Sequence, residues 1–298
     1  MKTHRMQKVT DIFNKKKPTF SFEFFPPKTE EGIVHLQQTA RVLADEGADW
    51  FSVTYGAGGS TKELTLNLVS NLQNQLQIPV LHHLTCVGYT AETLRTMIGE
   101  MKKRGVHNIV ALRGDPPKGQ NEWQAQPGGF QYCYQLIDLI KEFDEHFSIG
   151  VAGFPEGHIN CPSLELDTKY LQMKLNHGGQ YVITQFFFDN QQYFDYVSRV
   201  RKAGIKTQII PGILPIVNYE RALNMAYTNG TSIPPVVHKL FAPIADDKEA
   251  TVQAGYEYAL TQCRELLDGG APGIHLFALN RLNPALELFQ ALKQYLKQ

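Results

Sequence analysis

The carboxyl group of Glu23 stands among four phenylalanines in the run TFSFEFFPPKT, residues 19–29. A buried carboxylate costs free energy unless it is paired, protonated or used in chemistry. The alternation of a strand lets only some of the rings face Glu23, but those rings disfavour its charged form, and Pro26-Pro27 supplies no stabilising backbone N–H. We therefore expect a glutamic acid with a raised pKa, able to donate a proton near neutral pH. The alternative is a structural carboxylate that holds Arg113 or another basic group.

Other polar side chains recur where apolar runs end. Such positions carry Thr54 and Tyr55, His82 and His83, Arg113-Gly114-Asp115, Phe154-Pro155-Glu156, Gln185, and Asn280-Arg281. If the runs are parallel strands of a barrel, their carboxyl ends meet at one face and form one site from many loops. Adjacent histidines on a strand point to opposite faces, so we expect only one of the pair in the site. No HxH or HExxH pattern occurs, and we expect no catalytic metal.

The elements that must position these groups follow a regular alternation. Eight short runs rich in β-branched and aromatic residues alternate with amphipathic segments such as 30–47 and 90–105; the runs lie near 19–25, 50–55, 79–85, 108–112, 148–154, 181–187, 207–214 and 273–279. This pattern predicts the α/β class, as a (β/α)8 TIM barrel in a single domain over residues 18–298. The last connection, 215–272, is long enough for two helices. Residues 1–17, with Lys15-Lys16-Lys17, are expected to form a solvated N-terminal tail.

An open doubly wound sheet is the alternative architecture. The nearest candidate for its dinucleotide fingerprint is TYGAGGST, residues 54–61. That run lacks the third glycine, and no acidic residue follows at the offset that binds ribose. The run is better explained as a loop that allows a ligand to approach the backbone.

Composition narrows the class of protein. Lys+Arg and Asp+Glu balance at 29 each in 298 residues, so charge gives no reason to expect nucleic acid or an anionic membrane as partner. We recognise no secretory segment and no apolar run long enough for a membrane helix. Cys86, Cys133, Cys161 and Cys263 form no CxxC pair, which is typical of reduced thiols in the cytoplasm.

Several motifs, taken together, resemble the methylenetetrahydrofolate reductase family. They are SFEFFPPKT, SVTYGAGG, HLTC, ALRGDPP, ITQFFFD, IIPGILPI and FALNR, in the order and spacing of that family over residues 18–297. The length is similar to the short bacterial form. The resemblance implies a flavoprotein barrel that uses FAD and NADH or NADPH to reduce 5,10-methylenetetrahydrofolate to 5-methyltetrahydrofolate, which feeds methionine synthesis. It also implies a homo-oligomer, a tetramer or a dimer.

The resemblance further implies roles for individual residues. Glu23 would be the acid, and Asp115 would be a second catalytic residue that contacts the pterin and tunes the direction of electron transfer. Gln185 would contact the pterin and also hold the nicotinamide, and Arg281 and Met225 would meet the substrate. The residues that would bind FAD or its neighbours are Thr54, Tyr55, Ala57, His83, Arg113, Gly114, Asp115, Tyr132, Cys133, Phe154, His158, Asp167, Tyr170 and Lys174. Four positions depart from a bacterial relative: Phe154 replaces tyrosine, Tyr170 asparagine, Cys133 alanine and Met225 a stacking aromatic residue. Residues 116–131 align poorly, and we expect a lid-like role for them.

The chemistry that this implies needs a proton. The methylene carbon is held between two nitrogens, and hydride attack requires one C–N bond to open after protonation by Glu23. We expect the two substrates to react in turn, with ping-pong kinetics. The alternatives are a cofactor-free lyase or aldolase, for which the predicted strands contain no lysine, and a flavin- or folate-binding subunit that needs a partner protein for NAD(P)H oxidation.

Overall fold

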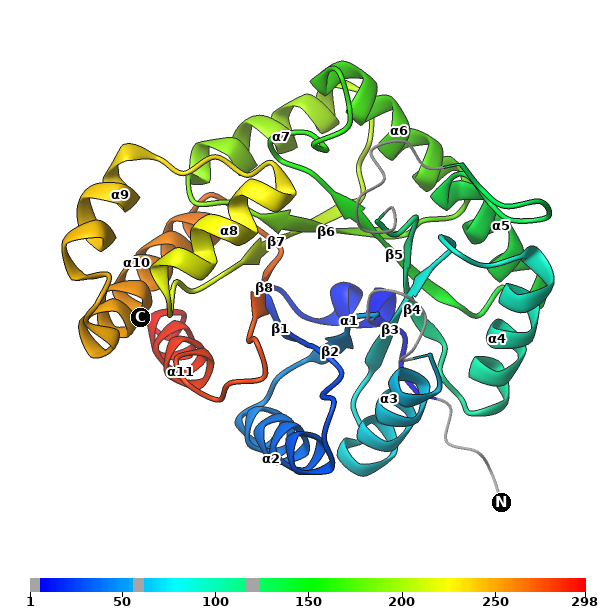
Figure 1. The fold of residues 1–298 in the computed structure, drawn as a ribbon, viewed down its shortest axis with the longest axis horizontal. Helices are drawn as coiled ribbons and strands as arrows, with labels where there is room; N and C mark the ends of the chain where they lie inside the picture. Colours follow the sequence, from blue (N-terminus) through cyan, green and yellow to red (C-terminus); the bar gives the residue numbers. More distant parts are fainter. Residues whose placement is uncertain (1–5, 56–61, 116–123) are drawn as a thin grey trace.

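The computed structural model describes residues 6–55, 62–115 and 124–298 of the chain. Its centre is a closed barrel of parallel strands in sequential order, from β1 to β8, with β8 pairing back to β1 (Figure 1). The strands are β1 (Thr19–Phe24), β2 (Trp50–Val53), β3 (Val80–Thr85), β4 (Asn108–Leu112), β5 (Ser148–Gly153), β6 (Tyr181–Phe186), β7 (Gln208–Ile213) and β8 (Gly273–Phe277). The predicted (β/α)8 barrel and all eight strands are confirmed.

Helices cover the outside of the barrel and join its strands (Figure 1). They are α2 (Glu30–Glu46), α3 (Lys62–Leu76), α4 (Ala91–Lys103), α5 (Cys133–Phe143), α6 (Leu164–His177), α7 (Asn190–Lys202), α8 (Tyr219–Asn229), α9 (Pro235–Phe241), the short 3-10 helix η1 (Ala242–Ile244), α10 (Lys248–Asp268) and α11 (Ala285–Tyr295). The connection after β7 holds α8, α9 and α10, so the expectation of two helices there was too low. Within the described residues, no helix has both the length and the apolar character needed to cross a membrane.

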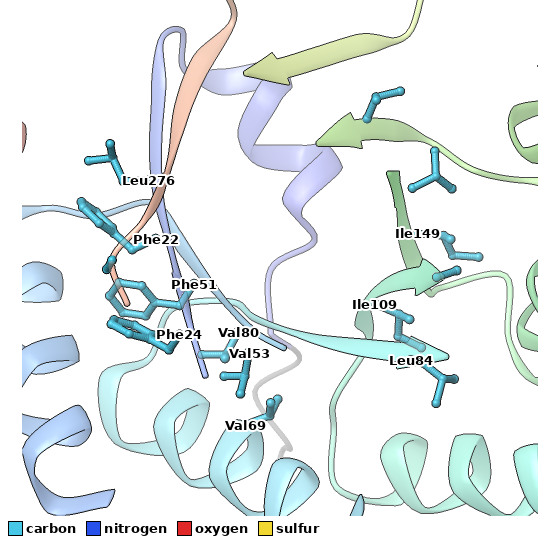
Figure 2. Close-up of a cluster of buried hydrophobic side chains, with 14 of the residues drawn as sticks. Phe22, Phe24, Phe51, Val53, Val69, Val80, Leu84, Ile109, Ile149 and Leu276 are labelled. Atoms are coloured by element: carbon cyan, nitrogen blue, oxygen red, sulfur yellow. The ribbon is translucent and has the colours of Figure 1, made fainter. Parts of the chain in front are cut away.

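The phenylalanines of β1 face the helices and not the interior of the barrel. The Phe22 ring lies 6.1 Å from Phe51 and 5.4 Å from Phe289 between ring centroids, and Phe24 lies 5.4 Å from Phe51. Figure 2 shows Phe22, Phe51 and Phe24 gathered in this outer layer. Because side chains alternate along a strand, Ser21 and Glu23 take the opposite, inward face. The prediction that these rings surround Glu23 is therefore wrong.

The N-terminal segment is part of the folded barrel. Helix α1 (Val9–Lys15) lies within the ring of strands in Figure 1 and buries Val9, Ile12 and Phe13 against apolar residues inside the barrel. The Phe13 ring meets Tyr181 edge-on at 5.4 Å, and the Val9 backbone N–H donates to Asn108 Oδ1 at 2.9 Å. Residues 9–13 thus close the barrel end opposite the carboxyl ends of the strands, where we had expected a solvated tail. The three consecutive lysines, from Lys15 to Lys17, are exposed as expected.

Candidate active site

Glu23 lies at the carboxyl end of β1, inside the barrel, among polar groups from three other strands. Ser52 Oγ on β2 donates to Glu23 Oε2 at 3.3 Å. The Nε2 atoms of His83 on β3 and His275 on β8 each lie 3.4 Å from the same oxygen. The Glu23 residue is 6% exposed, so the carboxyl group meets protein groups on nearly every side. We call Glu23, Ser52, His83 and His275 the carboxyl cluster.

The electrostatics of this cluster differ from the sequence-based expectation. Burial raises the pKa of Glu23, but the charge of His83 and the interactions with His275 and Ser52 together outweigh it, so the pKa falls below its ordinary value. Burial lowers the pKa of His83. The prediction of a raised pKa is wrong, because polar partners take the place of the expected rings. Glu23 and His83 influence one another electrostatically, so their titrations are coupled.

The neighbouring pair of histidines divides as expected. His83 faces Glu23, whereas His82 is buried on the other face of β3, with its ring 5.9 Å from that of Tyr55. Among the residues that the structure describes, no group of three or more His, Cys, Asp or Glu side chains could hold a metal ion.

A second group of candidate residues gathers at the ends of β4 and β5 and on α6. Lys174 Nζ donates to the Ala152 carbonyl oxygen at 2.6 Å and lies 5.7 Å from the centre of the Phe154 ring. Burial lowers the pKa of Lys174, while Cys133 and Asp167 act in the opposite direction. The ammonium group of Lys174 is therefore a hydrogen-bond donor that is largely removed from water and lies beside an aromatic ring.

His158 and Asp167 belong to the same region. The His158 backbone N–H donates to Asp167 Oδ1 at 3.2 Å, and the Phe154 and His158 rings meet edge-on at 4.8 Å. Burial raises the pKa of Asp167 and lowers that of His158, which also interacts electrostatically with Arg113 and Asp115. The structure thus brings these predicted residues into one network.

Arg113 and Gly114 follow β4 directly. Arg113 Nε donates to the Gly114 carbonyl oxygen at 3.3 Å, and the guanidinium group carries four further N–H donors. Gly114 has φ +90°, and an added Cβ would meet Thr85 Cβ at 3.0 Å and Val87 Cβ at 3.1 Å. Only glycine fits this turn without strain, and the turn fixes the direction of Arg113 and Asp115.

The side chains present fit a flavin dinucleotide. Such a ligand needs cationic donors for its diphosphate and apolar or aromatic surface for its rings. Arg113 and Lys174 are such donors, and the exposed rings of Tyr132 and Tyr170, 48% and 44% exposed, offer aromatic surface that the protein itself leaves uncovered. Of the other predicted contacts, Cys133 donates to the Ala111 carbonyl oxygen at 3.1 Å.

The loop after β2 holds the remaining predicted flavin contacts. The backbone N–H of Thr54 donates to the Phe24 carbonyl oxygen at 2.9 Å, which ties this loop to β1. The Tyr55 hydroxyl lies 2.6 Å from the Tyr89 hydroxyl, and burial raises its pKa. Ala57 lies outside the described residues.

Three of the predicted substrate contacts, Gln185, Met225 and Arg281, lie on the β6–β8 side of the barrel, whereas Asp115 is exposed after β4. Gln185 Nε2 donates to Asn229 Oδ1 at 2.8 Å, and Asn229 Nδ2 donates in turn to the Met225 carbonyl oxygen at 2.8 Å. Arg281 is exposed on the loop after β8. That loop is anchored by Asn280, which exchanges two hydrogen bonds of 2.8 Å with the Phe25 backbone. The structure therefore joins Gln185 to Met225 and fixes the loops that follow Glu23 and precede Arg281.

Sequence reasoning missed Ser52, Asn229 and His275. His275 alternates with apolar residues in GIHLF, and a single histidine in such a run is an available signal for an inward-facing polar position. Ser52 pairs in register with Glu23 across β1 and β2, which the sequence does not reveal. Asn229 is the last residue of α8, where we had attended only to Met225.

The fold and the site define a class of protein: a (β/α)8 barrel with a polar, partly ionisable site at the carboxyl ends of its strands, where barrel enzymes carry their chemistry. A family model for methylenetetrahydrofolate reductase matches residues 8–293. The chain belongs to the methylenetetrahydrofolate reductase family.

Individual relatives agree with this assignment. The chain is 34% identical over 261 residues to the 5,10-methylenetetrahydrofolate reductase of Escherichia coli, covering 88% of this chain and 86% of the relative. It is 35% identical over 285 residues to methylenetetrahydrofolate reductase (NADH) 1 of Arabidopsis thaliana, covering 92% of this chain and 48% of the relative. The chain thus spans about half the length of its plant and yeast relatives.

A solved structure shares the fold. It is a protein from Clostridium thermocellum that binds two copies of 5-methyl-5,6,7,8-tetrahydrofolic acid, with a TM-score of 0.64, 17% identity, and coverage of 97% of this chain and 100% of that one. At this identity the likeness shows a common fold alone.

Proposed function

We propose that the protein reduces 5,10-methylenetetrahydrofolate to 5-methyltetrahydrofolate, with FAD as its cofactor and NADH or NADPH as the reductant. Family membership supports this reaction. The observation within the site that carries the proposal is Glu23, which is almost fully buried at the carboxyl end of β1, with the Nε2 atoms of two histidines 3.4 Å from one of its oxygens.

FAD, when bound, would accept hydride from NAD(P)H and pass it to the folate. Arg113 and Lys174 would hold its diphosphate, and Tyr132, Tyr170 and Phe154 would flank its rings. Thr54, Tyr55, Ala57, His83, Gly114, Asp115, Cys133, His158 and Asp167 would complete the site. We expect both substrates to use one site in turn, which gives ping-pong kinetics.

Glu23 would supply the proton that opens the methylene bridge. Hydride cannot attack the bridging carbon until one of its two nitrogens leaves, and that nitrogen leaves readily only when it is protonated. Burial is the largest single influence on the pKa of Glu23 and raises it. Ring systems bound over the mouth of the barrel would bury the carboxyl group further and strengthen this influence, which favours the protonated carboxyl group.

Asp115 and Gln185 would contact the pterin, with Gln185 also contacting the nicotinamide, and Arg281 and Met225 would complete the substrate site. Gln185 is suited to this role because its amide is already oriented by Asn229 at 2.8 Å. We further propose that the protein works as a homo-oligomer in the cytoplasm and that its product feeds methionine synthesis.

The substitution Glu23→Gln tests the proposed acid, with each half-reaction followed separately by stopped-flow absorbance. We expect the reaction of reduced flavin with 5,10-methylenetetrahydrofolate to slow by about 10²–10⁴-fold, the usual contribution of a general acid. Reduction of the flavin by NADH should remain within about twofold of wild type, because that half-reaction needs no acid of this kind.

A matched control is Glu142→Gln, which changes an exposed glutamate paired with Arg95 and should alter neither half-reaction. Loss of both half-reactions in Glu23→Gln would show that Glu23 holds the flavin or the fold. A yellow wild-type protein that NADH cannot reduce would instead favour a subunit that depends on a partner protein.

A further inference from the structure

His275 is the most enclosed member of the carboxyl cluster. Its residue is fully buried, and its ring stacks on that of Trp50 with centroids 5.0 Å apart and planes 15° apart. Both ring nitrogens face polar atoms. Nδ1 lies 2.8 Å from Ser21 Oγ, and Nε2 lies 3.4 Å from both Glu23 Oε2 and Ser52 Oγ. Each nitrogen of this buried ring therefore has a hydroxyl or carboxyl oxygen within reach.

The contacts of His275 suit either charge state of Glu23. When Glu23 is ionised, Nε2–H donates to the carboxylate, and Nδ1 accepts the hydrogen bond of the Ser21 hydroxyl. When Glu23 is protonated, its O–H donates to Nε2, and the ring proton lies on Nδ1 and is donated to Ser21 Oγ. Ser21 can then direct its own hydroxyl to the Ile274 carbonyl oxygen, which lies 3.4 Å away. The two arrangements differ by one proton, which solvent supplies, and by the tautomer of one ring.

We propose that His275 is a positioning residue for Glu23, and that it stabilises both the protonated and the ionised carboxyl group by changing tautomer against Ser21. The inference rests on the proposed acid role of Glu23. An acid must be held in one place before and after it gives up its proton. A histidine whose second ring nitrogen contacts a hydroxyl group can accept a hydrogen bond from the protonated acid and donate one to the ionised acid.

Within the described part of the chain, groups from β2, β3 and β8 face this pair. From β3, His83 lies 3.4 Å from Glu23 Oε2 and interacts electrostatically with His275. From β2, Ser52 and Trp50 meet the His275 ring, and from β8 the Phe277 ring lies 5.6 Å from it. A pH dependence of Glu23 is therefore coupled to that of His83.

Two variants and one spectroscopic measurement test the proposal on the FAD-loaded protein. We expect His275→Gln and Ser21→Ala to slow the folate half-reaction by about 10- to 100-fold and to shift the pH profile of its rate. This loss is smaller than the loss of about 10²–10⁴-fold expected when the acid itself is replaced. Flavin reduction by NADH should stay within about twofold of wild type, because it does not use the acid. The control is Ser148→Ala, an equally buried serine on β5, across the barrel from β1, which should change neither rate nor profile.

The spectroscopic measurement is ¹⁵N NMR of the imidazole groups in wild-type holoenzyme. We expect the His275 nitrogens to change between the two tautomers over the pH interval in which the folate half-reaction changes rate. Constant His275 signals across that interval, or an unshifted pH profile in Ser21→Ala, would overturn the proposal, whether or not His275→Gln folds. If Glu23→Gln leaves folate reduction intact, the proposed function of Glu23 fails. If Glu23→Gln is inactive while His275→Gln and Ser21→Ala match wild type, only the role of His275 fails.

Discussion

The buried His82 should make the stability of the protein depend on pH. It lies on the face of β3 opposite His83, it is 1% exposed, and its Nδ1 atom has no hydrogen-bond partner within the described structure. Burial, with a smaller contribution from His83, lowers its pKa from 6.5 to about 3. The folded protein therefore resists protonation at a position where the unfolded chain accepts a proton freely.

The sign and size of the effect follow from proton linkage. As pH falls below 6.5, the unfolded state binds a proton that folded His82 does not, so stability is full above pH 6.5 and is lost as pH falls toward 3. A tenfold change in proton concentration is worth about 1.4 kcal/mol in this interval. Between pH 8 and pH 5 the free energy of unfolding falls by about 2 kcal/mol because of His82. Only the interval from pH 6.5 to pH 5 contributes, and it spans about one and a half tenfold changes in proton concentration.

The assay compares free energies of unfolding from urea titrations at pH 8 and pH 5. The wild-type value should fall by about 2 kcal/mol more than that of His82→Gln, which has no imidazole to titrate. The matched control, His35→Gln, replaces an exposed histidine on α2 and should keep the wild-type pH dependence. Equal losses in wild type and His82→Gln would refute the reasoning.

Two further predictions concern the closed end of the barrel and the proposed flavin site. Phe13→Ala should lower the free energy of unfolding by about 3–5 kcal/mol, because it leaves a cavity against Tyr181. The control Lys15→Ala, at an exposed position of α1, should change this free energy by no more than about 0.5 kcal/mol. Equal urea midpoints for the two variants would contradict the role of α1. Lys174→Met should weaken FAD binding by about 10- to 100-fold in a fluorescence titration, which is the usual value of a hydrogen bond to a charged group. The control Lys169→Met, at an exposed position on the same helix, should bind FAD as wild type does. Equal dissociation constants for the two variants would show that Lys174 does not bind the diphosphate.

Local patterns in the chain were sufficient for the secondary structure of the barrel. Each strand is a short run of β-branched and aromatic residues, and the helix over residues 30–47 ends at Gly47, which takes a left-handed φ of 105°. The N-terminal helix was missed because seven residues between charged neighbours give too short a pattern, and Phe13 becomes informative only once Tyr181 lies beside it.

The candidate site could be predicted only in part. The motifs indicated Glu23 and Arg113, the family resemblance implied Lys174, and alternation indicated that one of His82 and His83 faces inward. The environment of Glu23 was predicted wrongly, because neighbours along the chain were taken for neighbours in space. In a strand the adjacent phenylalanines point to the opposite face, so they say little about the surroundings of the carboxyl group.

By itself, the sequence determined where strands and helices form and which residue types could supply acid, cation and aromatic surface, because these depend on local periodicity and side-chain chemistry. Only the tertiary structure decided what Glu23 meets. Closure of the barrel pairs β1 with both β2 and β8. This pairing brings Ser52 and also His275, which lies 252 residues from Glu23 along the chain, to the same oxygen of the Glu23 carboxyl group. Whether that carboxyl group is protonated therefore depends on strand register. Contacts between distant segments set the register, and no local sequence pattern predicts it.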